Sequence, residues 1–465
     1  MRRSPLKYPY SLGNLKKRVL EVPDFLEEFA SSVFSKKEIL KEKMLKGKPN
    51  PLANDFEKYF MANWIPLNSM NGYSINPGAL GITAVDSSVY TNLMSTGGIF
   101  YVIRSLAVCR DRQEKLVESD AIFTKASLLE SQRFVGRKME MLEFRVAIEA
   151  IKHGLECGSI LVDGSLFGRA SHLPIETKIE DQQLMLLHYF ETYRELLDLC
   201  KKENIMLVGV SKESRSSFYR DYLLKLIFNE AVDSLESNMD PGDLNRLKPL
   251  FAELLDREEV ARRKFSKLRQ KYGKRLNAIE LIFDELSSSR PDYQLIMNHA
   301  TTPGYTSPLL LGPSANIARR LNQCWRDPTK YVRTYFPTSA RNESKDFVKW
   351  ATGILQNLMN FPSFISFHLL LDVRDSPIRI DLLCWDHSFS KTGWPKPIDV
   401  KLDDLLKIIV TGYCGLDCYN LWLKNVDEKV RLKKRVVDTI YFPLMEKMFD
   451  AKIIRGRGYR RVRFP

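Results

Sequence analysis

The sequence of 465 residues lacks several features that would assign it to a common protein class. No apolar run is long enough to cross a bilayer, so we expect no membrane association. Histidine is scarce, with six residues, and the seven cysteines are scattered and odd in number, which argues against a disulfide framework. Cys414 and Cys418 are the one close pair. Without a second pair or a nearby histidine, they favour buried thiols over a zinc site.

Motifs of two large enzyme classes are missing as well. The chain has no Gly-x4-Gly-Lys-Ser phosphate loop, so any motor must be a partner protein. Ser165 lacks the flanking glycines of a Gly-x-Ser-x-Gly motif, which argues against a serine hydrolase. Residues 1–7 are basic and lead into Tyr, Pro and Gly rather than an apolar signal core, and we therefore expect a cytoplasmic protein.

Positive charge, in contrast, is abundant. Lys and Arg number 71 against 57 Asp and Glu, and the formal net charge is +14. Such a surplus favours a polyanionic partner, although ordinary soluble proteins also carry it. The composition, 44% hydrophobic and 28% charged, predicts a folded chain. We expect four parts: a helical and basic arm at 1–80, a core at 81–217, a helical insertion at 218–299, and a carboxy-terminal part with a basic tail at 300–465.

The order of the expected elements predicts an α/β fold. Apolar runs and alternation predict three strands at 82–86, 99–108 and 117–123, followed by a helix at 133–153. A strand at 159–163, an amphipathic segment at 176–202 and a strand at 205–210 follow. A meander followed by alternating helices and strands implies a mixed sheet flanked by helices, in the ribonuclease H-like order. Charged helices at 218–287 form the insertion, and the strands of a carboxy-terminal α+β extension are expected at 331–336, 364–371 and 377–383.

Carboxylates fall at particular places in this order. Asp86 and Asp163 each end an apolar strand, and ligands commonly dock at such a rim of a sheet. The alternative for each is a turn-capping aspartate. The helix between the two strands carries Glu140 and Glu143 on one face and Glu149 off that face. We favour Glu143, because its apolar neighbours indicate a stripe turned toward the sheet, and the choice among the three remains open.

Acids gathered at one rim predict a metal site. Neighbouring carboxylates repel one another and need a cation to stay ionised together. Oxygen ligands select Mg²⁺ or Mn²⁺ over zinc, and two such ions can activate a water and stabilise the leaving oxygen of a phosphodiester. Asp86, Glu143 and Asp163 are therefore candidate metal ligands and catalytic residues. Lys212 follows a strand and could hold the scissile phosphate; a solvated loop lysine is the alternative.

Short motifs along the chain match those of a known family. They are Ala-Val-Asp at 84–86, Leu-Val-Asp-Gly-Ser-Leu at 161–166, Leu-Val-Gly-Val-Ser-Lys at 207–212, Asp-Ser-Pro-Ile-Arg-Ile-Asp at 375–381 and Gly-Trp-Pro at 393–395. Through these motifs, over roughly residues 80–410, the chain resembles the NurA nucleases of archaea. The resemblance implies a ribonuclease H-like core that forms a homodimer around a DNA channel, with a HerA-type hexameric ATPase and translocase as partner.

The resemblance also implies an activity. It implies a metal-dependent nuclease for single-stranded DNA and duplex ends, active in 5′–3′ end resection during double-strand break repair. Asp86, Glu143 and Asp163 would hold Mn²⁺ or Mg²⁺. The chain departs from the family pattern at Trp394, where the family has tyrosine. The family has a histidine or aspartate a few residues later; this chain has no histidine there, so Asp403 is a candidate fourth ligand, with Asp399 and Asp404 as alternatives. The alternatives are a DNA-end binding or translocase-adaptor protein that no longer cleaves, and a nuclease for RNA.

Candidate DNA contacts lie in the carboxy-terminal part. Arg379 belongs to the motif at 375–381. The tail carries further arginines with an interleaved tyrosine, a composition that suits contact with the backbone and stacking with bases. A disordered solubilising tail is the alternative. The tail arginines named as candidates are Arg455, Arg457, Arg460 and Arg461.

Overall fold

The structure, a computed structural model, describes residues 25–46, 51–67, 72, 76, 81–124, 127–212, 214–288, 290–342, 345–393 and 395–455. The chain divides into two units, Met1–Ala53 and Asn54–Pro465. The first contains α1 (Leu26–Ser35), α2 (Lys37–Lys41) and a π-helical turn at Glu42–Lys46. No helix among the described residues is long and apolar enough to cross a membrane.

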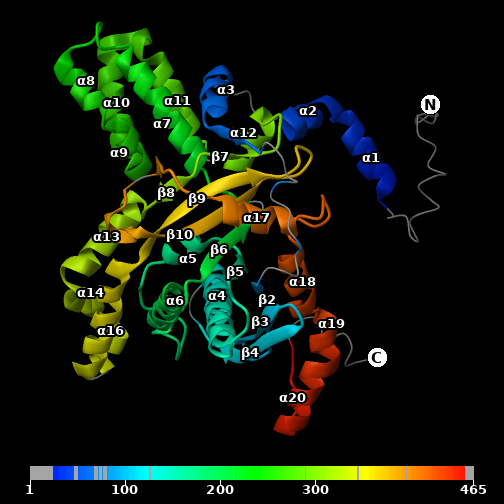
Figure 1. Cartoon of the computed structure of the whole chain (residues 1–465). Coiled ribbons are helices and arrows are strands. Elements are labelled where there is room, and N and C mark those ends of the chain that lie inside the picture. Colours follow the sequence, from blue (N-terminus) through cyan, green and yellow to red (C-terminus); the bar gives the residue numbers. More distant parts are fainter. Residues whose placement is uncertain are drawn as a thin grey trace, which may run out of the picture. The chain divides into compact units, whose positions relative to one another are not determined.

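The second unit is built on one mixed sheet of eleven strands. Its main path runs β1–β7–β9–β10–β6–β5–β2–β3–β4 (Figure 1). β2 (Ile82–Leu93), β3 (Ile99–Cys109) and β4 (Arg112–Ile122) form an antiparallel meander. β5 (Ser159–Asp163) lies beside β2 and parallel to it, and β6 (Met206–Ser211) is parallel to β5. The predicted mixed sheet flanked by helices is confirmed.

Strands from distant parts of the chain extend this sheet. They are β1 (Trp64–Pro66), β7 (Gly304–Thr306), β8 (Leu309–Leu311), β9 (Pro362–Leu370), β10 (Ile378–Ser388) and β11 (Lys396–Pro397). The antiparallel pair β9 and β10 confirms the two strands expected near 364–371 and 377–383. The strand expected at 331–336 is wrong, because this segment belongs to helix α14 (Pro328–Tyr335). Asp327 caps that helix by accepting a hydrogen bond from the Lys330 amide, and Pro328 occupies its first turn.

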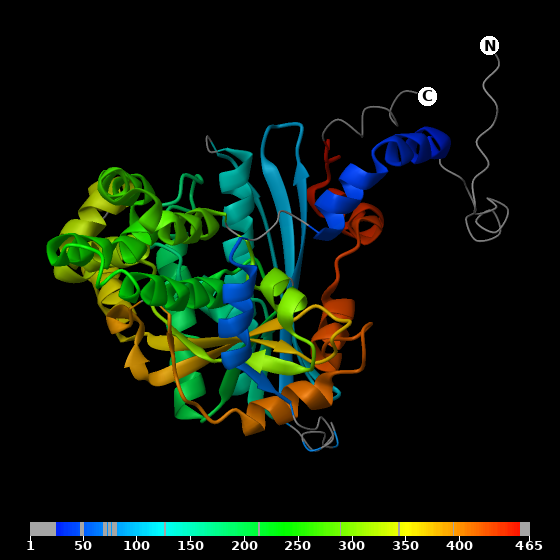
Figure 2. The same ribbon diagram turned by 90° about the horizontal axis from the view of Figure 1, so that it is seen from above.

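Helices cover both faces of the sheet near β2. α4 (Leu128–Lys152) and α6 (Met185–Lys202) lie on one face, and α17 (Asp403–Gly412) and α18 (Leu421–Val430) lie on the other (Figure 2). Successive side chains of a strand point to opposite faces. Ala84 of β2 packs in the core under α17 and α18, whereas Ser87 reaches α4. Asp86 therefore points toward the α18 side.

The segment 218–299, expected to be a helical insertion, is largely helical. It consists of α7 (Phe218–Asp233), α8 (Pro241–Leu247), α9 (Leu250–Asp256), α10 (Glu258–Tyr272) and α11 (Asn277–Ser287), followed by α12 (Asp292–His299). Its interior holds buried phenylalanines at 228, 251, 265 and 283. Many basic side chains of α10 form ion pairs, such as Lys264 with Glu253 at 2.6 Å. These pairs favour a solvated helix surface over DNA contact for α10.

The remaining helices complete the carboxy-terminal part. They are α5 (Leu166–Ala170) after β5, the group α13 (Ala315–Arg326), α14, α15 (Pro337–Asn342) and α16 (Lys345–Asn357), and the closing helices α19 (Lys434–Val436) and α20 (Phe442–Phe449). α16 contacts α6, so this group extends the layer that covers the α4 side of the sheet.

Candidate active site

Two of the predicted acids lie side by side on neighbouring strands. The parallel register pairs Ala84 with Leu161 and Val85 with Val162, so Asp86 and Asp163 follow at the same level of the sheet. Both point toward α18, because Ala84 and Leu161 two residues earlier face that side. The apolar residues before each acid bury the strands, and each acid begins the more exposed end. The sheet thus places two carboxylates together at its rim.

The helix acid reaches the same region from α4. Glu143 is buried, with 5% of its surface exposed, and accepts a hydrogen bond from the hydroxyl of Ser87. Its second carboxylate oxygen pairs with the guanidinium of Arg169, which is also buried. The same Arg169 nitrogen donates to the main-chain carbonyl of Asp163 at 3.1 Å. Arg169 therefore ties the helix acid to the end of β5.

Burial and mutual repulsion change the acidity of these groups. Burial raises the pKa of Asp86 from 3.8 to about 7, and the charges of Glu143 and Asp163 add to the effect. The main-chain amide of Ser87 donates to Asp86 at 2.8 Å and opposes the rise. Burial also raises the pKa of Glu143, against the attraction of Arg169. A cation bound between such carboxylates would relieve their repulsion.

Lys212 and a tyrosine complete the open side of the site. The Lys212 ammonium lies 3.1 Å from a carboxylate oxygen of Asp163 and 4.4 Å from the centre of the Tyr419 ring. The Tyr419 hydroxyl donates to the same carboxylate at 3.4 Å. Burial and the charges of Asp163 and Asp86 raise the pKa of Tyr419 far above its ordinary value, so its hydroxyl remains a donor. Lys212, predicted from the strand before it, therefore lies at the acids.

One further acid adjoins the site from α18. The charge of Asp427 contributes to the raised pKa values of both Asp86 and Tyr419, so its carboxylate lies within electrostatic range of the pair. Asp427 is half-buried and pairs with Arg431 one turn later at 2.6 Å. It follows Tyr419 by eight residues, on a helix whose start is capped by the side chain of Asn420.

The other glutamates of α4 have different partners. Glu140 accepts from the hydroxyl of Tyr189 at 2.7 Å and lies 2.9 Å from the imidazole of His172. Glu149 pairs with His153 at the end of the helix and does not join the acid cluster. The helix face chosen for Glu143 is the one that meets Ser87 and Arg169.

The sequence did not identify three of these residues. Arg169 follows the Asp-Gly-Ser motif on a short helix with apolar neighbours, and a lone basic residue there was the available signal. Tyr419 and Asp427 had no local signal, since only the packing of α18 against β2 brings them to the acids. Asp403, the predicted fourth acid, is exposed at the start of α17, and no interaction with the acid pair is recorded for it among the described residues. Trp394 lies outside the described residues.

Arg379, predicted to contact DNA, is instead buried. Its guanidinium donates to Asp381 through two nitrogens, at 2.9 and 3.0 Å, and to Ser366 at 2.9 Å. The Asp381 carboxylate also accepts from the hydroxyl of Ser165 at 2.6 Å and from the amide of Phe167. This network fixes the loop after Asp163 against β10. A buried guanidinium held in this way has a structural role, and the predicted DNA contact is corrected accordingly.

The basic tail is only partly within the described residues. Arg455 pairs with Asp438 at 2.5 Å, and its guanidinium lies 3.9 Å from the centre of the Phe442 ring. Arg455 therefore packs against the α20 region. The other tail arginines, Arg457, Arg460 and Arg461, lie outside the described residues.

The side chains that could bind a metal ion at this site offer oxygen atoms as ligands. Asp86 and Asp163 supply adjacent carboxylates, and Asp427 adds a third from α18, which suits a hard divalent cation. Across the residues that the structure describes, however, no three His, Cys, Asp or Glu side chains are arranged closely enough to hold a metal ion. One oxygen of Glu143 is paired with the Arg169 guanidinium.

The chain is similar to known proteins of one family. A family model for the NurA domain matches residues 80–432, and no curated protein matches the chain. Among solved structures, the NurA nuclease from Sulfolobus solfataricus is 14% identical, with a TM-score of 0.48, over 91% of this chain and 98% of that chain. A NurA structure with manganese has 15% identity and a TM-score of 0.39, over 90% of this chain and 98% of its own. A NurA structure bound to dAMP and manganese has 15% identity and a TM-score of 0.36, over 92% and 96%. Because the family match spans more than three quarters of the chain, this protein belongs to the NurA family.

Proposed function

We propose that this protein is a metal-dependent nuclease that hydrolyses phosphodiester bonds of DNA. The observation that carries the proposal is the acid pair Asp86 and Asp163, at one level of two parallel strands and beside Glu143 and Lys212. Membership of the NurA family supports the same activity. The strand order β4–β3–β2–β5–β6, with the first three antiparallel and the last two parallel to β2, supports a ribonuclease H-like core.

The cofactor in this proposal is Mn²⁺ or Mg²⁺, as one ion or two. Asp86 and Asp163 would hold it, and Asp427 or an oxygen of Glu143 would complete the ligands. When bound, such an ion supplies a water nucleophile and neutralises charge on the leaving oxygen. Because burial raises the pKa of Asp86 to about 7, the metal-free site holds a proton near neutral pH that cation binding releases.

The protein's own side chains prepare the site in distinct ways. Arg169 fixes the position of Glu143 and supplies buried positive charge. Tyr419 donates to Asp163 and limits the rotation of its carboxylate. Lys212 is exposed, lies at the open side and can contact a phosphate oxygen of a bound strand. The substrate phosphate would therefore approach from the side of Lys212 and Tyr419.

The proposal includes two protein partners and a biological process. The chain would form a homodimer and work with a HerA-type hexameric ATPase in 5′–3′ resection of DNA ends. Family membership supports these partners, and the sequence contains no phosphate loop with which to drive its own movement. Light scattering of the protein alone, and again with the ATPase and ATP, tests both. A strict monomer that joins no ATPase would contradict this part and leave the chemistry unaffected.

Two observations favour a second candidate, a DNA-end binding or adaptor protein of the same family. Glu143 is neutralised by Arg169 in place of a metal, and no three ligating side chains converge among the described residues. A buried ion pair of this kind would suit a fold that keeps the acids without the chemistry. The two candidates agree on DNA binding and differ only in cleavage.

Incubation with labelled single-stranded DNA separates the candidates. The nuclease proposal predicts shorter products with Mn²⁺ or Mg²⁺ and none with a chelator. Binding without cleavage under every metal condition would support the adaptor. A parallel reaction with labelled RNA of the same sequence determines the preferred sugar.

A further inference from the structure

A second surface of the molecule carries an excess of basic over acidic side chains. Residues 315–342, which form α13 to α15, contain six basic residues and one acidic residue. The acid, Asp327, is used to cap α14. Among the described residues, Arg319 pairs with Asp256, and no salt bridge is recorded for the other five. These five are Arg320, Arg326, Lys330, Arg333 and Arg341.

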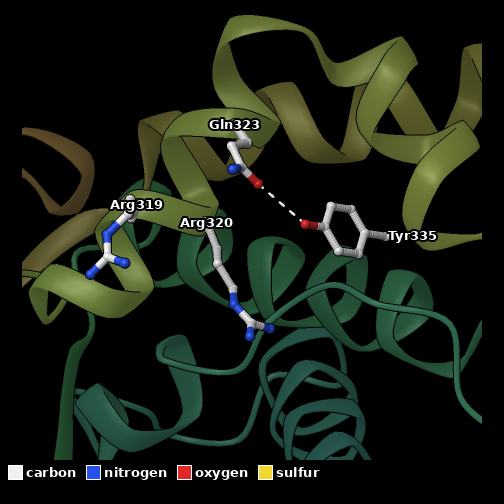
Figure 3. A pocket seen from close by; sticks show the side chains of 4 residues that line it. All are labelled: Arg319, Arg320, Gln323 and Tyr335. Carbon is white, nitrogen blue, oxygen red and sulfur yellow. Dashed lines mark hydrogen bonds between the residues drawn. The ribbon is translucent and has the colours of Figure 1, made fainter. Parts of the chain in front are cut away.

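Arg320 points into a hollow on this surface. The hollow measures about 290 Å³ and is lined by Arg319, Arg320, Gln323 and Tyr335 (Figure 3). Tyr335 donates a hydrogen bond to Gln323 at 3.2 Å, and its ring lies 4.4 Å from that of Tyr331. Figure 3 shows the Arg320 guanidinium directed away from Arg319. The hollow thus combines the guanidinium of Arg320 with the ring of Tyr335.

The surface continues from α14 to α4. A second hollow of about 480 Å³ shares Arg320 and Tyr335 with the first and extends to the segment 175–180. A third, of about 160 Å³, shares residues 175–179 and reaches Arg133 and Arg137 on α4. Three adjoining hollows therefore run from α13 to α4, with an arginine at each end.

Two of the three acids that line these hollows have partners. Glu176 accepts from the amides of Thr338 and Ser339, each at 3.0 Å. Glu130 caps the first turn of α4 and pairs with Lys178 at 3.4 Å. The third, Glu180, is exposed at the second hollow. Within the part of the chain that the structure describes, Arg320 and Arg137 form no salt bridge with any of these three acids.

Arg137 is the less exposed of the two arginines. It is half-buried, and among the described residues no hydrogen bond or salt bridge is recorded for it. Burial lowers the pKa of Arg137, the charge of Glu140 on the same helix opposes this shift, and the like charge of Arg133 adds to it. The Glu140 carboxylate already accepts from Tyr189 and lies beside His172. A further anion at Arg137 would therefore stabilise this half-buried guanidinium.

We infer that these hollows bind the phosphodiester backbone of a single-stranded nucleic acid, with Arg137 and Arg320 as phosphate-binding groups. Arginine suits phosphate because its planar fork donates two parallel hydrogen bonds. Tyr335 adds a face on which a base can stack. Arg137 precedes Glu143 by six residues on α4, which corresponds to about 9 Å along the helix. The inference rests on the proposed nuclease function for its choice of ligand. The part of the strand that is bound by this surface would lie outside the acid site.

The test is binding of labelled single-stranded DNA in the presence of a chelator, measured over a range of NaCl concentrations. The variant is Arg137→Gln/Arg320→Gln, and the matched control is Arg263→Gln/Arg275→Gln, which removes the same charge from the helical insertion. Loss of two phosphate contacts should reduce the slope of log affinity against log salt by about 1.4, since each contact on a single strand contributes about 0.7. The control should keep the wild-type slope.

A wild-type slope in the Arg137→Gln/Arg320→Gln variant would overturn the inference. If this variant does not fold, Arg320→Gln alone provides the test, because Arg320 is exposed; its slope should fall by about 0.7, the contribution of one contact. Cleavage is measured separately, with Mn²⁺ and the wild-type protein. A reduced slope in the variant together with no cleavage by the wild type would uphold this surface and reject the nuclease. Cleavage together with an unchanged slope would do the reverse.

Discussion

The substitution Asp86→Asn should stabilise the metal-free protein while abolishing its metal response. Asp86 is buried with 9% of its surface exposed, and repulsion by Glu143 and Asp163 acts on its charged form. An asparagine keeps the side-chain oxygen that accepts from the Ser87 amide and removes the charge. The gain in the free energy of unfolding should depend on pH.

The size of this gain in the free energy of unfolding follows from the raised pKa of Asp86. Below pH 3.8 the carboxyl is protonated in both the folded and the unfolded chain, so it does not penalise folding there. As the pH rises, the unfolded chain loses its proton first, and the stability contributed by the protonated folded form is lost by the time the pH passes about 7. The difference between the two pKa values corresponds to about 4 kcal/mol. We therefore expect Asp86→Asn to gain about 1.5 kcal/mol at pH 5 and about 4 kcal/mol at pH 8.

Urea unfolding in the presence of a chelator, at pH 5 and pH 8, measures this gain. The control is Asp403→Asn, an exposed acid whose removal should change stability by less than about 0.5 kcal/mol at either pH. Added Mn²⁺ should raise the stability of the wild type and leave Asp86→Asn unchanged, because the variant lacks a ligand charge. Equal gains at pH 5 and pH 8 would refute the raised pKa, and a destabilised variant at pH 8 would refute the repulsion among the acids.

Further expectations concern the partners of the acid pair. Glu143→Gln should lower the rate of cleavage far more than Glu149→Gln, because only Glu143 meets Ser87 and Arg169; similar losses would contradict the assigned helix face. Arg169→Met should cost roughly 3–5 kcal/mol in urea unfolding by leaving the Glu143 charge buried and unpaired, and adding Glu143→Gln should recover most of the loss; no recovery would show that Arg169 acts elsewhere. Asp427→Asn should weaken Mn²⁺ binding in titration calorimetry, and an unchanged affinity would exclude Asp427 as a ligand.

The strand acids could be predicted because their signals are local. Short, mostly apolar runs end at Asp86 and Asp163, which indicates strands buried on both faces. The position of the carboxylate at the strand exit then follows from chain direction alone. The face of α4 was likewise available from helical periodicity, which placed Glu143 above its apolar neighbours.

Predictions from the sequence failed where packing between elements distant in the chain determines the structure. The segment 331–336 alternates like a strand, yet the Asp327 cap and Pro328 start a helix there. Asp427 reaches the acids only because α18 packs on β2, a contact between residues more than 300 positions apart in sequence. Arg379 looked free in sequence, but β10 places it beside Asp381 in the interior. Charge alone did not distinguish a buried structural arginine from one that faces a ligand.

Cleavage of DNA by the Asp163→Asn variant tests most directly the claim that acids on β2 and β5 hold a catalytic metal ion. The amide retains the shape of the side chain and removes the charge that a divalent cation requires at the end of β5. Labelled single-stranded DNA is incubated with Mn²⁺ and equal amounts of wild type, Asp163→Asn and Asp403→Asn, after circular dichroism has established that all three are folded. We predict products from the wild type and from Asp403→Asn, and none from Asp163→Asn. Full cleavage by a folded Asp163→Asn protein would contradict an acid-held metal site between β2 and β5.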